Sequence, residues 1–326
     1  MCTDIIFERV MQVEVLKMLK YYLELLGYFD MPEFIVKYLK CPSLIRLKDV
    51  GYFCGMDYAS KDIYDFREYI SRFDHSLTVA LIVYKLTCDK KTTIAGLFHD
   101  IATPCFSHVI DYMNKDHEKQ ESTEEYTELI IRNDTWLCHC LEEDGIDLRD
   151  IVDFKKYSVV DNDRPKVCAD RVDGVVLTGI GWTKNISKDD IKNIVMAMNL
   201  YQNESEELEI GFNSLNVAKL VLMVSESIDL YCHSKEDFYM MELLAKITKY
   251  AIDTNIICYD DLYKINEKKL ISILEESNDL YLKELVLEFK TKRKEDVGDI
   301  RVSNVKIRDL NPLVNGERLK LIRTRN

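Results

Sequence analysis

Apolar residues return every three or four positions along most of this 326-residue chain, and this spacing constrains its fold more than any other feature. The spacing is clear in four stretches: 13–26 (VEVLKMLKYYLELL), 77–86 (LTVALIVYKL), 216–224 (NVAKLVLMV) and 238–252 (FYMMELLAKITKYAI). An apolar face with this period is typical of an α-helix that packs against a core. Only five prolines and eleven glycines interrupt the pattern. The sequence therefore predicts a mainly α protein.

The pattern changes after the charged run KTKRKED at 290–296. Residues 305–307 (VKI) and 318–322 (RLKLI) alternate in the manner of strands, and Asn315-Gly316 between them is typical of a tight turn. The end of the chain is therefore expected to contain some β structure.

These two patterns suggest a division of the chain. The hydrophobic content of 47% is enough for a large core. We expect a helical domain over residues 1–290, with its core at about 36–250, and a small β-containing C-terminal appendage over residues 291–326.

The formal net charge of −13 argues against a general attraction to the nucleic-acid backbone. The charge is uneven, because residues 290–326 hold eleven Lys or Arg and five Asp or Glu. This basic tail suits a contact with phosphate groups as well as it suits a solvated edge or a contact with a neighbouring subunit.

No segment indicates export or a membrane anchor. The first residues, MCTDIIFERV, contain no basic segment followed by an apolar signal core, and no run reaches the roughly 18 apolar residues that span a bilayer. The ten cysteines are scattered without a CxxC pair, which argues against a zinc ribbon or a disulfide framework. We expect a cytoplasmic protein with no membrane partner.

Four of the six histidines fall within 43 positions, and each lies beside or near a carboxylate. They are His75, His99, His108 and His117. In the stretch LFHDIATPCFSHVID (97–111), an apolar, helix-like run ends on His99 and Asp100. A buried His-Asp pair must be hydrogen-bonded or bind a ligand, because unpaired polar groups in a core are costly.

Imidazoles and carboxylates together suit a divalent ion such as Mn²⁺, Fe²⁺ or Zn²⁺ and leave coordination positions for water and substrate oxygens. His75 begins one apolar helix, and His99 and Asp100 end another, so a further helix has to complete the site. The best candidate for the missing carboxylate is Asp170, in VCADRVDG. Asp173 lies three residues further on the same helical face and is expected to orient Asp170.

The order of these residues resembles the HD superfamily of metal-dependent phosphohydrolases. Further stretches are similar to successive blocks of the deoxynucleoside triphosphate (dNTP) triphosphohydrolases within that superfamily. They are 42–51 (PSLIRLKDVG), 72–80 (RFDHSLTVA), 97–111, 116–122 (DHEKQES), 169–174 (ADRVDG), 259–274 (YDDLYKINEKKLISIL) and 307–317 (IRDLNPLVNGE). The resemblance covers roughly residues 36–315 and implies an HD-domain helical bundle with additional helices.

The resemblance implies one divalent ion with four protein ligands, which are His75, His99, Asp100 and Asp170. The identity of the ion stays open among Mn²⁺, Fe²⁺, Ni²⁺, Zn²⁺ and Mg²⁺, because it depends also on the supply of metal in the cell.

The resemblance also implies catalytic and substrate-binding roles around this ion. Asp111 and His117 match residues that assist the chemistry near the α-phosphate, and Glu118 is the acid beside His117. Arg72 matches an arginine that contacts substrate phosphate, where the guanidinium fork pairs two oxygens. Tyr231 resembles a tyrosine near the nucleoside.

For three further residues, both a structural role and a role in binding the substrate stay open. His108 either caps or packs a helix, or it contacts the substrate. Arg46 is either a salt-bridged arginine at the edge of the core or a phosphate ligand. His233 follows Tyr231 by two residues and is a candidate for the substrate pocket through the resemblance alone.

One position departs from the family pattern. Members usually follow the His-Asp pair with Gly-His-Gly-Pro-Phe-Ser-His or a close variant, whereas residues 102–108 here are ATPCFSH. Thr103 therefore stands where the family has a histidine at the substrate phosphates. The departure bears on which phosphate bond is cleaved and leaves the four metal ligands intact.

The resemblance implies an enzyme that hydrolyses a nucleotide phosphoester or phosphoanhydride, and most closely one that converts a dNTP to a deoxynucleoside and tripolyphosphate. The alternatives are an HD-type nucleotidase or phosphodiesterase, and a nucleotide-binding regulatory protein with an impaired site. The resemblance also implies a homo-oligomer. Base and sugar preference do not follow from any linear motif, because pocket shape sets them.

Overall fold

A computed structural model describes residues 17–115, 126–300, 302 and 306–325. Its first helices are α2 (Lys17–Leu25), α3 (Glu33–Tyr38), α4 (Pro42–Arg46), α5 (Arg72–Thr87), α6 (Lys90–Phe98), α7 (Val109–Met113), α8 (Thr127–Asn133), α9 (Thr135–Asp144) and α10 (Leu148–Val152). The later helices are α11 (Ala169–Gly181), α12 (Lys188–Ala197), α13 (Leu215–Cys232), α14 (Lys235–Asp253), α15 (Asp261–Lys264), α16 (Glu267–Glu276), α17 (Leu280–Thr291) and α18 (Leu319–Arg325). The strands are β1 (Met198–Gln202), β2 (Leu208–Phe212), β3 (Leu313–Val314) and β4 (Glu317–Arg318). The predicted mainly α fold is therefore confirmed.

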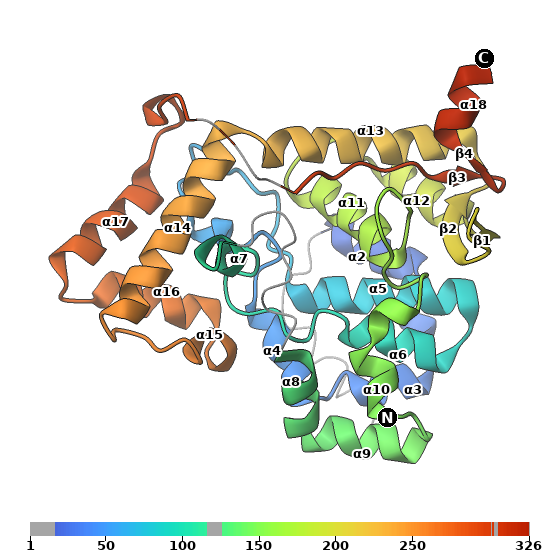
Figure 1. Ribbon diagram of the computed structural model, residues 1–326, viewed down its shortest axis with the longest axis horizontal. Helices are drawn as coiled ribbons and strands as arrows, with labels where there is room; N and C mark the ends of the chain where they lie inside the picture. The colour runs from blue at the N-terminus through green and yellow to red at the C-terminus, as the bar shows by residue number, and fades with distance from the viewer. Residues whose placement is uncertain (1–16, 116–125, 301, 303–305, 326) are drawn as a thin grey trace.

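The helix α5 lies at the centre of the molecule and packs against α6 and α11 (Figure 1). Every residue from His75 to Val83 is buried, so this helix is enclosed on all sides. A capping box fixes where it begins: the Ser71 hydroxyl accepts from the Asp74 amide at 3.1 Å, and the Asp74 carboxylate accepts from the Ser71 amide at 2.8 Å. His75 is therefore held in the first turn.

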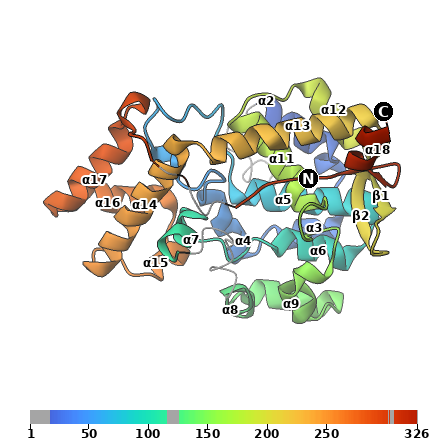
Figure 2. The same cartoon turned by 45° about the horizontal axis from the view of Figure 1, so that its top comes forward.

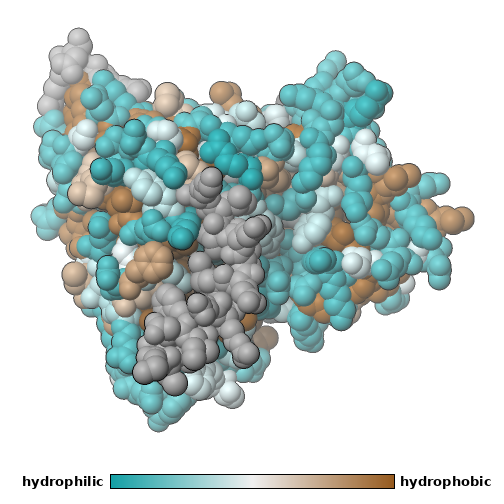
Figure 3. Space-filling model, turned by 180° about the vertical axis from the view of Figure 1, so that it is seen from behind, coloured by the Kyte–Doolittle hydropathy of each residue, from teal (hydrophilic) through white to brown (hydrophobic). Residues whose placement is uncertain are grey.

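The remaining elements cover this centre on several sides. The helix α13 lies along α11 and α12, and α14 packs against α7 and α17. Figures 1 and 2 agree in placing α14 to α17 at one end of the molecule and the strands with α18 at the other. On the face seen in Figure 3, apolar residues form small groups between hydrophilic ones, consistent with a core that holds most of the apolar side chains. No helix in the described ranges is long and apolar enough to cross a membrane.

The strands form one four-stranded sheet in the order β1-β2-β3-β4, with antiparallel outer pairs and a parallel β2–β3 pair. The predicted turn is present, because Asn315 (φ 50°) and Gly316 (φ 89°) connect β3 to β4 in left-handed conformations. The segment 318–322, expected as a strand, instead enters α18, and Lys306 and Ile307 belong to no strand. Alternation over five residues does not separate a strand from a buried helical turn.

Two of the four strands come from residues 198–212, which the sequence pattern placed among the helices. This sheet supports the segment that leads into α11. The Val167 amide donates to the buried Glu209 carboxylate at 3.0 Å, and the Ile210 amide donates to the Val167 carbonyl at 3.2 Å. The Asn311 amide donates to the Pro165 carbonyl at 2.9 Å. The C-terminal segment thus helps to place the start of α11, and the domain boundary near residue 290 stays a prediction.

Replacing Arg318 is expected to destabilise the fold through Glu209, which is 0% exposed. Arg318 donates to both Glu209 oxygens, at 2.6 and 2.7 Å, so Arg318→Met leaves a buried carboxylate without its cation. We expect the free energy of unfolding, measured in urea, to fall by about 3–5 kcal/mol. The control is Glu204→Gln, which removes the 61% exposed partner of Arg318 and should cost less than about 1 kcal/mol. Equal losses in the two variants would contradict this assignment.

Candidate active site

The buried side chains of His75 and His99 come from two packed helices and meet face to edge, with ring centroids 5.1 Å apart. His75 lies in the first turn of α5, and His99 directly follows α6. Each ring is held through its Nδ1 atom. The Nδ1 of His75 donates to the Asp173 carboxylate at 2.7 Å, and the Nδ1 of His99 donates to the Gly96 carbonyl at 2.8 Å. This tautomer, assigned from the acceptors, leaves both Nε2 atoms for a ligand.

Two carboxylates complete the group. The Asp170 Oδ1 lies 3.1 Å from the His75 Nε2 and 3.7 Å from the His99 Nε2. The two Asp100 oxygens lie 3.8 Å from the same nitrogens, one oxygen to each. Ligand atoms bound at about 2.0–2.2 Å to one ion stand at comparable distances from one another. The structure therefore brings all four predicted ligands together.

The chemistry of this group fits a divalent cation. The His99 Nε2 is buried and has no hydrogen-bond partner within the described ranges, a state that costs free energy unless a ligand binds there. Burial lowers the pKa of His75, but the carboxylates of Asp170 and Asp173 outweigh burial and raise it to about 10. Burial also raises the pKa of Asp170, yet His75 and His99 hold it well below its usual range. The site thus favours positive charge at the Nε2 atoms.

The role expected of Asp173 is different in the structure. Asp173 is fully buried and accepts from His75 rather than orienting Asp170. A carboxylate on the far nitrogen of a metal-binding imidazole fixes the ring and raises its basicity. The helical spacing places Asp173 on the face of Asp170, but the packing of α11 on α5 decides which residue it contacts.

Arg72 lies on the other side of Asp100. Its Nη1 donates to the Asp100 Oδ2 at 2.8 Å, its Nε donates to the Ser107 hydroxyl at 3.2 Å, and its guanidinium lies 4.9 Å from the centre of the Tyr52 ring. All four side chains line one cavity of about 1260 Å³. Arg72 therefore holds Asp100 in place and also faces the space where a substrate would bind.

His108 and Asp111 form a second pair at this cavity. The Nδ1 of His108 lies 2.9 Å from the Asp111 Oδ2; His108 lines the cavity, whereas Asp111 is 1% exposed and lies behind it. Burial lowers the pKa of His108, partly offset by Asp111. Thr103, in place of the expected histidine, also lines the cavity. The predicted catalytic residues His117 and Glu118 lie outside the described residues.

The remaining predicted substrate contacts are not part of the cavity lining among the described residues. Arg46 donates to the carbonyls of Ile101 and Thr103 at 3.0 and 2.8 Å, so it holds the loop after His99 and Asp100. Tyr231 is 45% exposed and its ring meets that of Trp182 at 5.6 Å, edge on. His233 contacts Asp229 at the end of α13.

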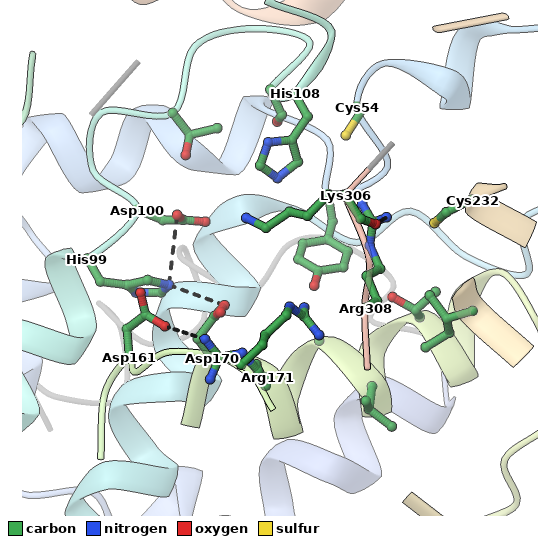
Figure 4. A pocket seen from close by; sticks show the side chains of 18 of the residues that line it. Cys54, His99, Asp100, His108, Asp161, Asp170, Arg171, Cys232, Lys306 and Arg308 are labelled. Carbon is green, nitrogen blue, oxygen red and sulfur yellow. Dashed lines mark hydrogen bonds and ion pairs between the residues drawn. The ribbon is translucent and has the colours of Figure 1, made fainter. Parts of the chain in front are cut away.

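Basic side chains that the sequence analysis did not assign surround the same cavity. Counting Arg72, eight basic and six acidic residues line it, although the whole chain carries a net charge of −13. The basic residues are Arg72, Lys155, Lys156, Arg164, Lys166, Arg171, Lys306 and Arg308. Figure 4 shows His99, Asp100 and Asp161 on one side of the pocket and Cys54, Cys232 and Arg308 on the other, with Lys306 between. In the sequence, the basic tail pointed to Lys306 and Arg308, and Arg308 also lies in the stretch 307–317 that resembles a family block.

A second group of potential ligands, Asp161, Cys168 and Asp170, shares Asp170 with the first. The Arg171 guanidinium lies 3.2 Å from the Asp161 carboxylate and already supplies a positive charge there. The first group is therefore the better candidate for a metal site.

Glu267, the first residue of α16, holds the turn that precedes His108. Its two oxygens accept from the amides of Phe106 at 2.8 Å and Gly51 at 3.0 Å. Phe106 (φ 66°) and Ser107 (φ 45°) are both left-handed, a conformation that non-glycine residues keep only when their surroundings impose it. Glu267 is thus a positioning residue. It lies within the stretch 259–274 that resembles a family block, but the sequence analysis gave it no role.

Comparisons with known proteins agree with this geometry. Residues 72–139 match the model of the HD domain family. The matched segment includes His75, His99 and Asp100 and ends before Asp170.

Two curated relatives are distant. The uncharacterized protein YdhJ of Bacillus subtilis is 21% identical over 212 residues, which are 64% of this chain and 62% of YdhJ. The metal-dependent phosphohydrolase cns2 of Cordyceps militaris is 24% identical over 133 residues, which are 40% of this chain and 37% of cns2. This chain thus spans less than two thirds of the length of either relative.

The stability of the protein should depend on pH through Glu267. Burial raises the pKa of this carboxyl from the ordinary value of 4.5 to about 8, even though the Phe106 and Gly51 amides lower it. Between about pH 5 and 8 the folded state then binds more protons than the unfolded chain. The contribution of Glu267 to the free energy of unfolding therefore falls as the pH rises through this range. The variant Glu267→Gln cannot ionise.

We therefore expect wild type to lose unfolding free energy relative to Glu267→Gln by on the order of 1 kcal/mol per pH unit between pH 5 and 8. Urea denaturation at each pH measures the difference, and the exposed Glu276→Gln in the same helix controls for the removal of one charge. A difference that stays constant with pH would contradict the raised pKa.

Proposed function

We propose that this protein is a metal-dependent phosphohydrolase that acts on a nucleotide, and that its reaction is the conversion of a dNTP to a deoxynucleoside and tripolyphosphate. One observation carries the proposal: the four candidate metal ligands converge, and three of them, His99, Asp100 and Asp170, line a cavity that also holds basic and aromatic side chains. The assignment as a metal-dependent phosphohydrolase rests on the HD domain. The choice of a dNTP as substrate rests on the sequence resemblance and on the cavity.

His75, His99, Asp100 and Asp170 would hold the ion. A divalent ion at these ligands supplies Lewis-acid polarisation of a phosphoryl oxygen and activates a water molecule for attack. Other residues of the chain hold these side chains in place: Asp173 orients His75, and Arg72 orients Asp100.

The basic cluster suits a substrate with several negative charges. Burial lowers the pKa of Arg164, and so do the neighbouring guanidinium groups of Arg171 and Arg308. Burial likewise lowers the pKa of Lys306, with Arg164 and Arg308 adding to the effect. Like charges that crowd one another in this way are relieved by an anion. A phosphate chain beside the metal ligands would provide that relief.

The cavity also has a second, aromatic end. Asp170 lies at the start of α11, and Gly174, Thr178 and Trp182 line the cavity at successive turns. At 1.5 Å per residue, Asp170 and Trp182 stand about 18 Å apart along the helix. Phe66 and Tyr64 lie beside Trp182, with ring centroids at 6.0 and 5.9 Å. A nucleoside on this side and phosphates at the metal would fill the cavity lengthwise.

In the proposed reaction, different residues of the chain stabilise the developing charge and transfer the proton. Arg72 donates hydrogen bonds to phosphoryl oxygens as charge builds on them. His108 is neutral because burial lowers its pKa, and with Nδ1 turned to Asp111 its Nε2 is placed to accept a proton from the attacking water. The water oxygen forms a bond to phosphorus, the bond from phosphorus to the 5′-oxygen breaks, and the proton passes to that oxygen. His117 and Glu118 remain candidates for the same transfer.

Thr103 supports one competing assignment. A histidine at this position would face the phosphates, and its replacement favours a nucleotidase or phosphodiesterase with the same metal ligands over a triphosphohydrolase. A nucleotide-binding protein without turnover is the other alternative. The three differ in their products.

The test is to incubate wild type and a His99→Ala/Asp100→Ala variant with Mn²⁺ and a panel of dNTPs, NTPs and monophosphates, with anion-exchange chromatography of the products. We expect tripolyphosphate from wild type and none from the variant, because the variant lacks two of the four ligands. His139→Ala, a 61% exposed histidine, is the matched control and should behave as wild type.

Orthophosphate alone would replace the triphosphohydrolase with a nucleotidase. Hydrolysis of a phosphodiester added to the same panel would replace it with a phosphodiesterase. Bound nucleotide with no product from any substrate would contradict an enzymatic role.

A further inference from the structure

The cavity contains a tyrosine beside the candidate metal ligands that the proposed reaction does not use. Tyr52 lines the cavity and is half-buried. It lies between the stretches 42–51 and 72–80 that resemble family blocks, so the resemblance assigns it no role. What Tyr52 can do therefore follows from the contacts of its backbone, its ring and its hydroxyl.

The backbone of Tyr52 is paired with the chain that leads into α5. The Tyr52 amide donates to the Ile70 carbonyl at 2.8 Å, and the Arg72 amide donates to the Val50 carbonyl at 2.8 Å. Two hydrogen bonds in opposite directions hold the two segments side by side. Tyr52 is thus fixed in position relative to the first turn of α5.

The Tyr52 ring contacts two side chains of that turn. Its centroid lies 4.9 Å from the Cζ atom of Arg72 and 5.0 Å from the centroid of the His75 ring, at an interplanar angle of 49°. A guanidinium group over an aromatic face is attracted by the ring. The ring therefore keeps Arg72 beside the His75 imidazole, and this contact does not require the hydroxyl.

The Tyr52 hydroxyl reaches α11, the helix that carries Asp170. A Cβ atom added to Gly174 would lie 3.1 Å from the Tyr52 Oη, so the hydroxyl lies directly over this glycine. Gly174 follows Asp170 by four residues, and positions at this spacing lie on one face of a helix, about 5–6 Å apart. Gly174 also lines the cavity. The hydroxyl is therefore at the cavity wall, one helical turn from a candidate metal ligand.

This hydroxyl is an unused donor. The Tyr52 Oη forms no hydrogen bond within the described ranges, and it is not among the side-chain atoms there that are buried without a partner. A tyrosine hydroxyl keeps its proton at neutral pH, because its ordinary pKa is about 10. Preorganised donors of this kind stabilise a transition state when they point to an oxygen on which charge develops.

We propose that the Tyr52 hydroxyl donates a hydrogen bond to a non-bridging oxygen of the phosphoryl group that reacts at the metal site. This inference rests on the proposed function, because it adds a catalytic residue to the same reaction. Negative charge builds on that oxygen as the water attacks, so the hydrogen bond strengthens in the transition state. The hydroxyl keeps its proton throughout, and the ring holds Arg72 at the same phosphoryl group.

The test compares Tyr52→Phe with wild type, because this variant removes the hydroxyl and keeps the ring. With Mn²⁺ and the dNTP that wild type hydrolyses fastest, we expect kcat to fall by about 10- to 100-fold and KM to change little. The amount of Mn²⁺ bound per chain and the melting temperature should keep their wild-type values. Tyr84→Phe, in α5 but outside the cavity lining, is the matched control and should keep the wild-type kcat.

A second measurement separates contact with the phosphate from a structural role of Tyr52. In an α-phosphorothioate of the same dNTP, sulfur replaces one non-bridging oxygen and accepts hydrogen bonds more weakly, and the two diastereomers carry the sulfur on different sides of the phosphorus. For one diastereomer, the loss of kcat/KM relative to the oxygen compound should be smaller in Tyr52→Phe than in wild type. Only wild type has a Tyr52 hydrogen bond to lose.

The outcomes separate this inference from the function on which it rests. A wild-type kcat in Tyr52→Phe, or a lower kcat with the wild-type loss for both diastereomers, would overturn the role of Tyr52 and leave the phosphohydrolase intact. Loss of bound Mn²⁺ in Tyr52→Phe would also overturn it, because the hydroxyl would then support the metal site instead of the substrate. Release of no product by wild type from any nucleotide would overturn the proposed function and this inference with it.

Discussion

The hydrogen bond from the His75 Nδ1 to the Asp173 carboxylate joins the two helices on which the site is built. It connects the first turn of α5 to the first turns of α11 and is shielded from water, since the two side chains are 1% and 0% exposed. It sets the His75 tautomer and turns its Nε2 toward Asp170 on the same stretch of α11. Without this bond, the orientation of the His75 imidazole would not be fixed at the position where the four candidate ligands meet.

The rest of the molecule supports this centre from segments that are distant in sequence. The sheet holds residues 165–168 just before Asp170, and Glu267 of α16 holds the turn just before His108. The C-terminal segment then crosses the cavity and contributes Lys306 and Arg308. Two basic residues of the tail thereby join a cavity in which eight basic residues stand beside six acidic ones, although the chain as a whole is acidic. This concentration of positive charge, rather than net charge, is what a phosphate-bearing substrate would meet.

The sequence predicts the helices well because they depend on a local signal. It also singles out four residues that the structure brings together, and their role as metal ligands stays a prediction. The apolar period identifies α5, α13 and α14, and the spacing of His75, His99, Asp100 and Asp170 follows a known family order. Residues whose role comes from tertiary contacts were not predictable in this way. Asp173 contacts His75 only because α11 crosses α5, and Glu267 reaches Phe106 across 161 positions. The two short strands at 198–212 were missed because five-residue segments carry little periodic signal.

The most direct test of this account is the amount of Mn²⁺ bound per chain, measured by electron paramagnetic resonance on metal-free protein titrated with Mn²⁺. The account predicts one tightly bound ion for wild type and loss of that ion in His99→Gln, where the orphaned Nε2 is removed while the helices remain folded by circular dichroism. Wild-type protein that binds no Mn²⁺, or a His99→Gln variant that binds it as tightly as wild type, would contradict the assignment of the metal site.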